Sequence, residues 1–317
     1  MYKIVVVGYG KMFANLILGC IESGHNVVGV FRHEKTTMAP FYLKIKDFIN
    51  PSDDKSFISS LGLHEIKAKS TNSELFRKAL LKLNADILLV GSWSEKIEKA
   101  TLSIPSVASI NCHPSLLPKY RGPNPYAQVI LKGEKKTGIT FHLMDSNFDT
   151  GAILHQKEIF ISETDTGETL KDKCTNMAKQ EIQLLLEKMS NEIVIPVMQE
   201  EKFASYQKQL CEKDILIDFD KTAEEIDRQI RALTPWLKCY ITCRDHFLRI
   251  RKYKIIDNYS CEKTPGIVIK HKNNLLHITC QNNKALELSE LELLGFLPKI
   301  TTPLFINHII KIGDKAQ

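Results

Sequence analysis

Three polar side chains in the first half of the chain have the types and spacing needed for acyl transfer. Asn111 and His113 end a strand-like apolar segment, and alternate residues of a strand point to the same side of a sheet. Asp149 precedes Gly151 in a segment typical of a tight turn between two strands. An amide can stabilise a tetrahedral oxyanion, an imidazole can move a proton, and a carboxylate can orient that imidazole. Together these residues predict a site for acyl transfer to an amine.

Each of the three residues also has a simpler interpretation. A single Asn, His or Asp at a strand end is most often a polar side chain whose hydrogen bonds are satisfied locally. The segment after His113 favours function, because Pro114, Pro118 and Gly122 predict a rigid loop that could press backbone amides against a flat ligand. Residue chemistry alone leaves both interpretations open.

The surrounding segments predict an α/β fold with a doubly wound, mostly parallel sheet. Short β-branched apolar runs alternate with helical patterns, as in successive βαβ units. The predicted strands are Lys3–Val7, Asn26–Phe31, Asp86–Val90, Val107–Asn111, Thr137–Met144 and Ile153–Ile161. Helical spacing predicts a helix after the first strand, a second over Leu75–Leu83, and a long one from Leu170 to Met189 that Asp165 and Glu168 should cap. Asn111 and His113 then lie at the carboxyl end of a strand, where such sheets bind ligands.

A change of pattern near residue 193 predicts two domains. Residues 1–192 form the predicted catalytic domain, residues 193–209 a polar linker, and residues 210–317 a second domain. In the second domain Thr222 and Glu225 predict a capping box ahead of a short helix. Short alternating strands follow, so we expect a small, mostly β, barrel-like domain.

The composition is that of an ordinary globular protein. The 317 residues are 43% hydrophobic, and the formal net charge of +6 suits a polyanionic partner without requiring one. The N-terminus enters a strand directly, so we expect a cytoplasmic protein without membrane association. The eight cysteines are scattered, as in proteins with reduced thiols. Cys239 and Cys243 are close but have no second ligand pair, so we expect no metal. No segment indicates an obligate protein partner.

Two further patterns have competing interpretations. Gly8-x-Gly10 after the first strand imitates a dinucleotide-binding loop, but its third glycine is missing, so a tight strand-to-helix turn is favoured over NAD(P) binding. Arg249, Arg251 and Lys254 lie in a basic segment with interleaved aromatic residues. These cations could follow a phosphate backbone, or they could form the solvated face of a strand.

The motif Asn-x-His-x-Ser-Leu-Leu-Pro-x-Tyr-Arg-Gly at residues 111–122, with Asp-x-Gly from residue 149, resembles the formyltransferase superfamily that uses 10-formyltetrahydrofolate. The resemblance covers nearly the whole chain. It implies that Asn111 holds the formyl oxygen, His113 assists proton transfer and Asp149 positions the histidine. It also implies a folate-binding loop at Ser115, Leu116, Leu117 and Pro118, with Gly91, Ser92 and Trp93 near the pterin. The implied formyl donor is 10-formyltetrahydrofolate.

The second half of the chain bears on the acceptor. The motifs Arg-Ala-x-x-Pro-Trp from residue 231 and Pro-Gly from residue 265 resemble the OB-like domain of methionyl-tRNA formyltransferases and some sugar formyltransferases. Pro114 and the loop Arg32–Phe48, which has no compact basic run, depart from the tRNA enzymes. We expect the acceptor to be the amine of methionyl-tRNA, contacted by Arg249, Arg251 and Lys254. An amino-sugar nucleotide is the alternative acceptor, and a non-catalytic nucleic-acid-binding protein is the alternative from another class.

Overall fold

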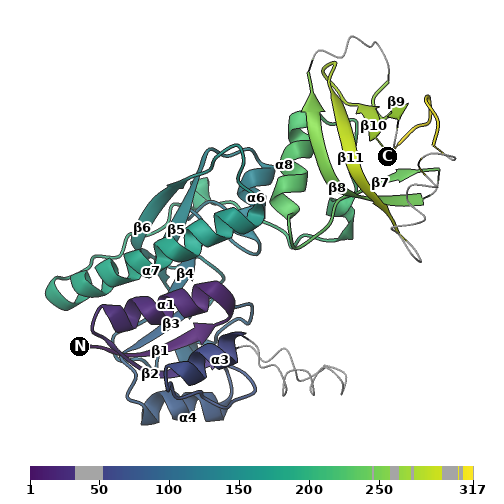
Figure 1. The fold of residues 1–317 in the computed structure, drawn as a ribbon. Coiled ribbons are helices and arrows are strands. Elements are labelled where there is room, and N and C mark those ends of the chain that lie inside the picture. Colours follow the sequence, from purple (N-terminus) through teal and green to yellow (C-terminus); the bar gives the residue numbers. More distant parts are fainter. Residues whose placement is uncertain are drawn as a thin grey trace. The chain divides into compact units, whose positions relative to one another are not determined.

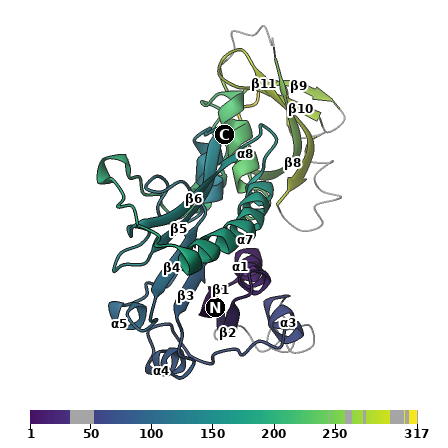
Figure 2. The same ribbon diagram turned by 90° about the vertical axis from the view of Figure 1, so that its left-hand side faces the viewer.

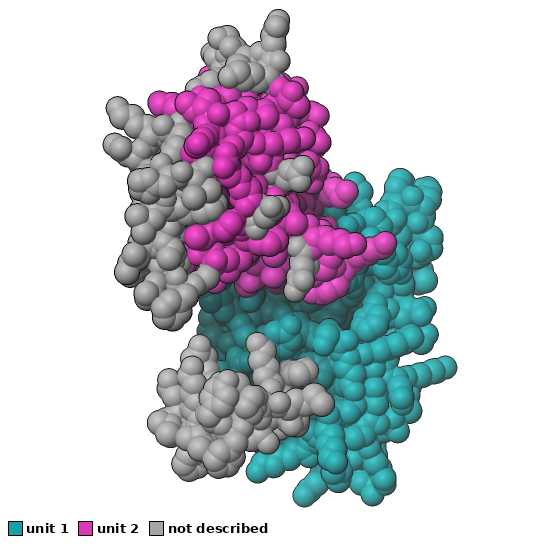
Figure 3. All heavy atoms as spheres, turned by 90° about the vertical axis from the view of Figure 1, so that its right-hand side faces the viewer, with its two compact units in different colours: residues 1–125, 136–160, 171–207 teal, residues 126–135, 161–170, 208–317 magenta. Residues whose placement is uncertain are grey.

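The computed structural model describes residues 1–32, 53–244, 246–257, 264–272, 275–294, 306 and 310–316. The chain divides into two compact units (Figure 3). Unit 1 comprises residues 1–125, 136–160 and 171–207, and unit 2 comprises residues 126–135, 161–170 and 208–317. The loop Arg32–Phe48 lies outside the described residues from position 33 onward, as does Cys261.

Unit 1 is built on a six-stranded sheet with the order β2-β1-β3-β4-β5-β6 (Figure 1). The strands are β1 (Lys3–Gly8), β2 (Asn26–Arg32), β3 (Ile87–Gly91), β4 (Ala108–His113), β5 (Lys136–Leu143) and β6 (Ile153–Phe160). The first four strands are parallel, whereas β5 and β6 are antiparallel to their neighbours. The six predicted strands and the mostly parallel sheet are therefore confirmed.

Helices cover both faces of this sheet because its strands are apolar on both sides. Val5 of β1 and Phe76 of α4 belong to one buried cluster. On the other face α1 and α7 lie side by side (Figure 2), and a Cβ added to Gly19 of α1 would be 2.4 Å from Ile182 of α7. The helices around the sheet are α1 (Gly10–Glu22), α3 (Asp53–Ser60), α4 (Glu74–Lys82), α5 (Lys99–Leu102) and α7 (Gly167–Asn191).

The start of α7 differs from the prediction. Thr166 and Thr169 cap each other, since the backbone N–H of each donates to the other's hydroxyl at 2.9 and 3.2 Å. The Asp165 carboxylate instead accepts from the backbone N–H of Ser162 at 2.7 Å, and the N–H of Glu168 donates to a carbonyl oxygen. The predicted capping box of Asp165 with Glu168 is therefore wrong by one position, because two threonines at the same spacing compete for the same role.

Unit 2 contains an antiparallel five-stranded sheet with the order β7-β8-β11-β10-β9. Lys315 pairs with Ile267 just before β9, and Ala316 pairs with Cys243 at the end of β7, so the C-terminal segment joins the two edge strands. This closure confirms the barrel-like domain. The strands are β7 (Tyr240–Cys243), β8 (His246–Ile256), β9 (Val268–Lys272), β10 (Leu275–Thr279) and β11 (Ala285–Leu293).

The principal helix of unit 2, α8 (Ala223–Leu233), packs its apolar stripe into the core of the barrel. Thr222 and Glu225 form the predicted capping box at its start, which is confirmed by reciprocal hydrogen bonds of 2.9 and 3.2 Å. A short helix, α6 (Pro125–Leu131), lies mostly in the same unit. Of two 3₁₀ turns, Glu201–Phe203 belongs to unit 1 and Glu212–Ile215 to unit 2. No helix in the described ranges is long and apolar enough to cross a bilayer.

The seven cysteines that the structure describes are all free thiols, and only Cys211 among them is exposed. Burial raises the pKa of Cys239 to about 12 and that of Cys243 to about 11. Because the thiolate is the reactive form, a raised pKa leaves almost no reactive species at pH 8.

We therefore expect iodoacetamide at pH 8 to label Cys211 at least tenfold faster than Cys239 and Cys243 in the folded protein, since a pKa raised by about two units lowers the thiolate fraction about a hundredfold. Peptide mass mapping measures the rates, and the protein in urea serves as the control in which all three should react alike. Equal labelling rates for the three cysteines in the folded protein would contradict the burial of Cys239 and Cys243.

Candidate active site

Asn111 and His113 project from the same face of β4. Cys112 between them contacts the sulfur of Met12 in α1 at 3.8 Å, so the two polar side chains point away from α1. His113 is 6% exposed and Asn111 is half-buried. In the sheet Asn111 lies between Val90 of β3 and His142 of β5. The strand alternation expected from the sequence therefore brings the two side chains together.

Asp149 reaches the same place from the connection between β5 and β6. Its carboxylate Oδ1 lies 3.2 Å from Nδ2 of Asn111 and 3.4 Å from Nδ1 of His113, and its Oδ2 accepts from the backbone N–H of Gly122 at 2.9 Å. Asp149 has a left-handed φ of 58°. Gly151 is needed for lack of space, because a Cβ there would be 1.8 Å from the carbonyl oxygen of Leu143. The three predicted residues thus meet in one cluster.

The charge of Asp149 is maintained by its surroundings. Burial on its own raises the pKa of this carboxyl group, but the attraction of His113, the neighbouring His142 and the hydrogen bond from Gly122 together hold the pKa well below its usual range. Since a depressed pKa keeps an acid ionised, Asp149 carries its negative charge throughout the neutral range. A fixed anion beside an imidazole can stabilise the positive charge that develops while the ring accepts a proton during a reaction.

The ring of His113 is oriented from both sides. Its Nε2 lies 2.9 Å from the backbone oxygen of Tyr120, which can only accept, so this nitrogen carries a hydrogen. Nδ1 is then the nitrogen that faces Asp149 and can take up or release a proton. This arrangement suits general acid–base chemistry at Nδ1.

A second histidine, His142 of β5, belongs to the cluster, although the amino-acid sequence alone gave no reason to assign this residue a role. It is 2% exposed, its Nδ1 lies 2.8 Å from the Leu143 oxygen, and its Nε2 lies 3.0 Å from Nδ2 of Asn111. Nε2 therefore accepts from the Asn111 amide. The signal for His142 was its position opposite Asn111, which only the strand register reveals. Its neighbour His155, by contrast, pairs with Glu181 at 2.5 Å and packs on Phe141.

These contacts occupy both amide hydrogens of Asn111, one on His142 and one on Asp149. An oxyanion bound by this amide would have to replace one of the two contacts. The contact with Asp149 is the longer at 3.2 Å, and two negative groups would compete for one hydrogen. The amide can therefore serve an oxyanion only by turning away from the carboxylate.

The loop after His113 is fixed to the sheet by its own backbone. Thr140 donates to the Ser115 carbonyl oxygen at 2.6 Å, the Leu117 N–H donates back to the Thr140 hydroxyl at 3.2 Å, and Gln156 donates to the Leu117 oxygen at 3.0 Å. The side chains of Ser115 and Leu117 are buried, whereas Leu116 and Pro118 are half-buried. Only the latter pair has side-chain surface to offer a ligand.

The residues expected near a pterin are the last residue of β3, Gly91, and the two that follow it, Ser92 and Trp93. A Cβ at Gly91 would be 2.6 Å from Leu16 of α1, so this glycine permits close packing of helix and strand. Ser92 has a left-handed φ of 57°. Trp93 lies with its ring centroid 5.5 Å from that of Phe31. The two rings are tilted by 56°, and Phe31 is buried, so of this pair only Trp93 has surface left for a ligand.

The Gly8-x-Gly10 turn has a structural explanation. A Cβ at Gly8 would be 2.2 Å from the Gly91 oxygen, so close approach of β1 and β3 requires glycine there. At the start of α1 the N–H of Gly10 donates to both carboxylate oxygens of Asp54, at 2.9 and 3.1 Å. A carboxylate thus takes the position that a dinucleotide's phosphate takes in proteins with the full fingerprint.

Within the described ranges no group of three or more His, Cys, Asp or Glu side chains is arranged to hold a metal.

The basic residues of β8 are paired with acids of β11. Arg249 and Arg251 both contact Glu292, at 3.4 and 2.8 Å, and Lys254 contacts Glu287 at 2.8 Å. The side chain of Arg249 is 20% exposed, and those of Arg251 and Lys254 are 46% and 65% exposed. Each of the three cations therefore has an acidic partner, although the two arginines share one glutamate, and this pairing weakens the attraction that an array of unpaired cations would exert on phosphates.

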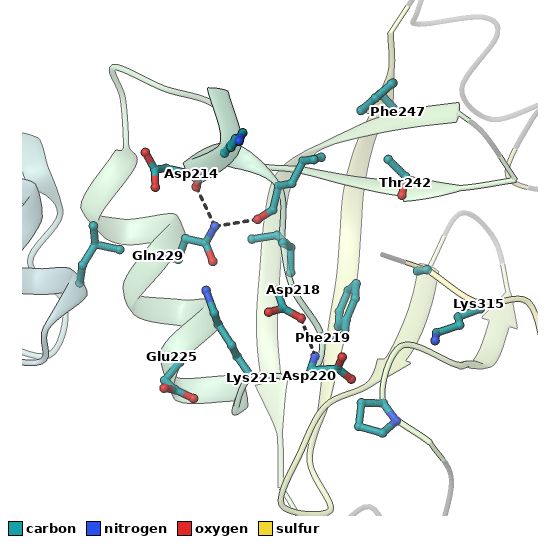
Figure 4. Close-up of a pocket in the computed structure, with 16 residues that line it drawn as sticks. Asp214, Asp218, Phe219, Asp220, Lys221, Glu225, Gln229, Thr242, Phe247 and Lys315 are labelled. Carbon is teal, nitrogen blue, oxygen red and sulfur yellow. Dashed lines mark hydrogen bonds between the residues drawn. The ribbon is translucent and has the colours of Figure 1, made fainter. Parts of the chain in front are cut away.

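Unit 2 also has a pocket of about 740 Å³ that sequence reasoning missed (Figure 4). Gln229 of α8 lines it and donates to the backbone oxygens of Asp214 and Leu216, at 2.7 and 2.9 Å. Acidic and basic side chains line the pocket together with Phe219 and Phe247. None of the residues assigned to the site from sequence lies in it.

Known proteins resemble this chain along most of its length. Residues 2–189 match the formyl transferase family, and residues 209–296 match the formyl transferase C-terminal domain. A methionyl-tRNA formyltransferase of Buchnera aphidicola is 32% identical over 92% of this chain and 91% of its own length. That of Caldanaerobacter subterraneus is 34% identical over 76% of this chain and 77% of its own length.

A solved structure has the same fold. It is an N-formyltransferase from Helicobacter canadensis in complex with folinic acid and dTDP-3-aminofucose, with a TM-score of 0.64 and 18% identity over 91% of this chain and 99% of its own. The cluster of Asn111, His113 and Asp149 lies within the matched N-terminal segment. The chain therefore belongs to the formyl transferase family.

Proposed function

We propose that this protein transfers a formyl group from 10-formyltetrahydrofolate to the amine of methionyl-tRNA. The observation that carries the proposal is the 32% identity to a methionyl-tRNA formyltransferase over more than nine-tenths of both chains. The cluster of amide, imidazole and carboxylate on β4 and the β5–β6 connection supports the chemistry. Because charged initiator tRNA is used in the cytoplasm, the proposal implies that the protein acts there.

In the proposed reaction the amine attacks the formyl carbon, a carbon–nitrogen bond forms, and the carbonyl oxygen becomes an oxyanion. Asn111 donates to that oxyanion after releasing Asp149. His113 takes the proton from the attacking nitrogen at Nδ1, helped by the charge of Asp149, and delivers it to the folate nitrogen as the bond to that nitrogen breaks. The products are the formylated amine and tetrahydrofolate, and atoms and charge balance.

For the formyl donor we propose the loop Ser115–Pro118 and the segment 91–93 as the folate site. Leu116, Pro118 and Trp93 are half-buried and offer apolar side-chain surface, and Phe31 packs behind Trp93. The fold relative from Helicobacter canadensis was crystallised with folinic acid, a folate derivative. We assign residues 1–192 to this chemistry, residues 193–209 to a linker and residues 210–317 to acceptor recognition.

An amino-sugar nucleotide is the second candidate acceptor, and two observations favour it. The same fold relative was crystallised with dTDP-3-aminofucose. The cations Arg249, Arg251 and Lys254 are engaged with acids, so fewer charges are left for a long phosphate backbone. A non-catalytic nucleic-acid-binding role is disfavoured because it would leave a buried, ionised Asp149 without use, and such groups cluster at functional sites.

Parallel assays with methionyl-tRNA and a dTDP-amino sugar, each with 10-formyltetrahydrofolate, test the acceptor directly. We expect formyl transfer to the tRNA.

Asn111→Ala should lower kcat about a hundredfold to a thousandfold, and His113→Ala about a hundredfold or more, because an oxyanion donor and a proton carrier act only on the transition state. His155→Ala, on the neighbouring β6, is the control and should stay within about threefold of wild type. Activity of either site variant within that range would remove the assigned roles.

Salt dependence distinguishes the acceptors by their charge. If tRNA binds through Arg249, Arg251 and Lys254, replacing all three with Ala should raise KM for tRNA and flatten its log–log salt dependence by about one unit for each lost phosphate contact. The matched variant Glu292→Gln frees two arginines from their acid and should lower KM. Turnover at saturating tRNA should change little in both. Activity that is insensitive to salt and to these variants would favour the sugar nucleotide.

A further inference from the structure

Arg121, in the loop that follows His113, is completely buried within unit 1, which is rare for a charged side chain. Its guanidinium donates to both carboxylate oxygens of Glu201, at 2.8 and 3.0 Å, and to the hydroxyl of Tyr206 at 3.1 Å. Nε and Nη2 both donate to Oε1 of Gln199, at 3.1 and 2.8 Å. Such a fully bonded guanidinium is rigid, because any movement would strand a buried charge.

Gln199 connects the fixed guanidinium to the turn at residues 149–151. Its amide nitrogen donates to the backbone oxygen of Asp149 at 2.9 Å and to that of Gly151 at 2.7 Å. Since Arg121 occupies the amide oxygen, the Gln199 amide can present only its two hydrogens to the turn. The orientation of one side chain thus fixes the backbone on both sides of Thr150.

The turn needs such support because its backbone is strained. A left-handed φ in a residue other than glycine costs about 1–3 kcal/mol and persists only where the surroundings enforce it. Asp149 has this conformation, with φ at 58°. Its side chain is held by Gly122 and Asn111, but only Gln199 holds its carbonyl oxygen among the hydrogen bonds of the described residues.

We propose that Arg121 and Gln199 form a positioning clamp that holds the turn at residues 149–151 so that the Asp149 carboxylate stays against His113. Neither residue touches the reacting atoms. The inference rests on the proposed function for the chemistry that the clamp supports. It goes further by giving a segment expected to be a linker, residues 193–209, a direct effect on the catalytic centre.

Two substitutions of Gln199 test the clamp. Gln199→Met removes the acceptor for Arg121 and both donors to the turn, with little change in side-chain length. Gln199→Glu keeps the acceptor for Arg121 and so preserves the buried arginine, but it turns a carboxylate oxygen toward the two carbonyl oxygens of the turn. Gln183→Met is the matched control, because Gln183 donates to Glu22 at 2.9 Å on an exposed surface between α1 and α7.

We expect both Gln199 variants to lower kcat about tenfold to a hundredfold while KM for donor and acceptor stays within about threefold, since a shift of about 1 Å in a catalytic group has effects of that size. The control should match wild type. Wild-type kcat in Gln199→Glu would overturn the clamp, because that variant retains the link to Arg121 and loses only the support of the turn.

Amide hydrogen exchange in the free protein gives an answer that needs no substrate. Gly122 donates its N–H to Asp149, so loosening the turn should speed exchange at Gly122 about tenfold or more in both Gln199 variants and leave the amides of β1 unchanged. Unchanged exchange at Gly122, or equal acceleration throughout β1, would overturn the inference. If neither acceptor is formylated by wild type, the proposed function fails, and the exchange rates still decide the clamp.

Discussion

The site depends on keeping one ionised carboxylate, that of Asp149, in a place largely removed from water. Burial alone would drive this group toward its neutral form. Its charge persists because a backbone N–H, an amide and an imidazole converge on its two oxygens. Those three partners come from the rigid loop after β4 and from β4 itself. The positions of strand, loop and turn are therefore set jointly by the need to satisfy one anion.

The fold meets this requirement through a change in strand direction. After four parallel strands, β5 runs antiparallel to β4, and the register sets His142 beside Asn111. The connection to β6 then brings Asp149 back to the face of the sheet from which Asn111 and His113 project. Gly151 permits this course, because any side chain there would collide with the Leu143 carbonyl oxygen. The same hydrogen bonds that hold Asp149 engage the Asn111 amide, so in the proposed reaction this amide would bind an oxyanion only as it releases the carboxylate.

Local patterns were sufficient to predict much of this arrangement. The alternation of Asn111 and His113 placed them on one face, and the βαβ pattern gave the strands, because both signals lie within a few consecutive residues. Contacts between distant segments could not be predicted in that way. His142 depends on the register of β4 with β5, and the Gln199 contacts depend on how residues 193–207 return to the β5–β6 turn.

Charge patterns read along one segment are incomplete for a related reason. Arg249, Arg251 and Lys254 form a dense basic run in one dimension, but Glu287 and Glu292 lie opposite them on β11. The pairing of adjacent strands brings together side chains that are far apart in the sequence. The start of α7 is a smaller case. Asp165 with Glu168 and Thr166 with Thr169 have the same spacing, and only the structure shows that the threonines bond to the free N–H groups.

The most direct measurement of the central claim is the single-turnover rate of formyl transfer in Asp149→Asn. This change keeps the size of the side chain and removes its charge, while leaving one of two buried donors without an acceptor at a cost of about 1–3 kcal/mol in unfolding free energy. Our account predicts a protein that stays folded and reacts at least about a hundredfold more slowly, because the imidazolium of His113 loses its counter-charge as the proton moves. A folded variant with a rate within about threefold of wild type would contradict it.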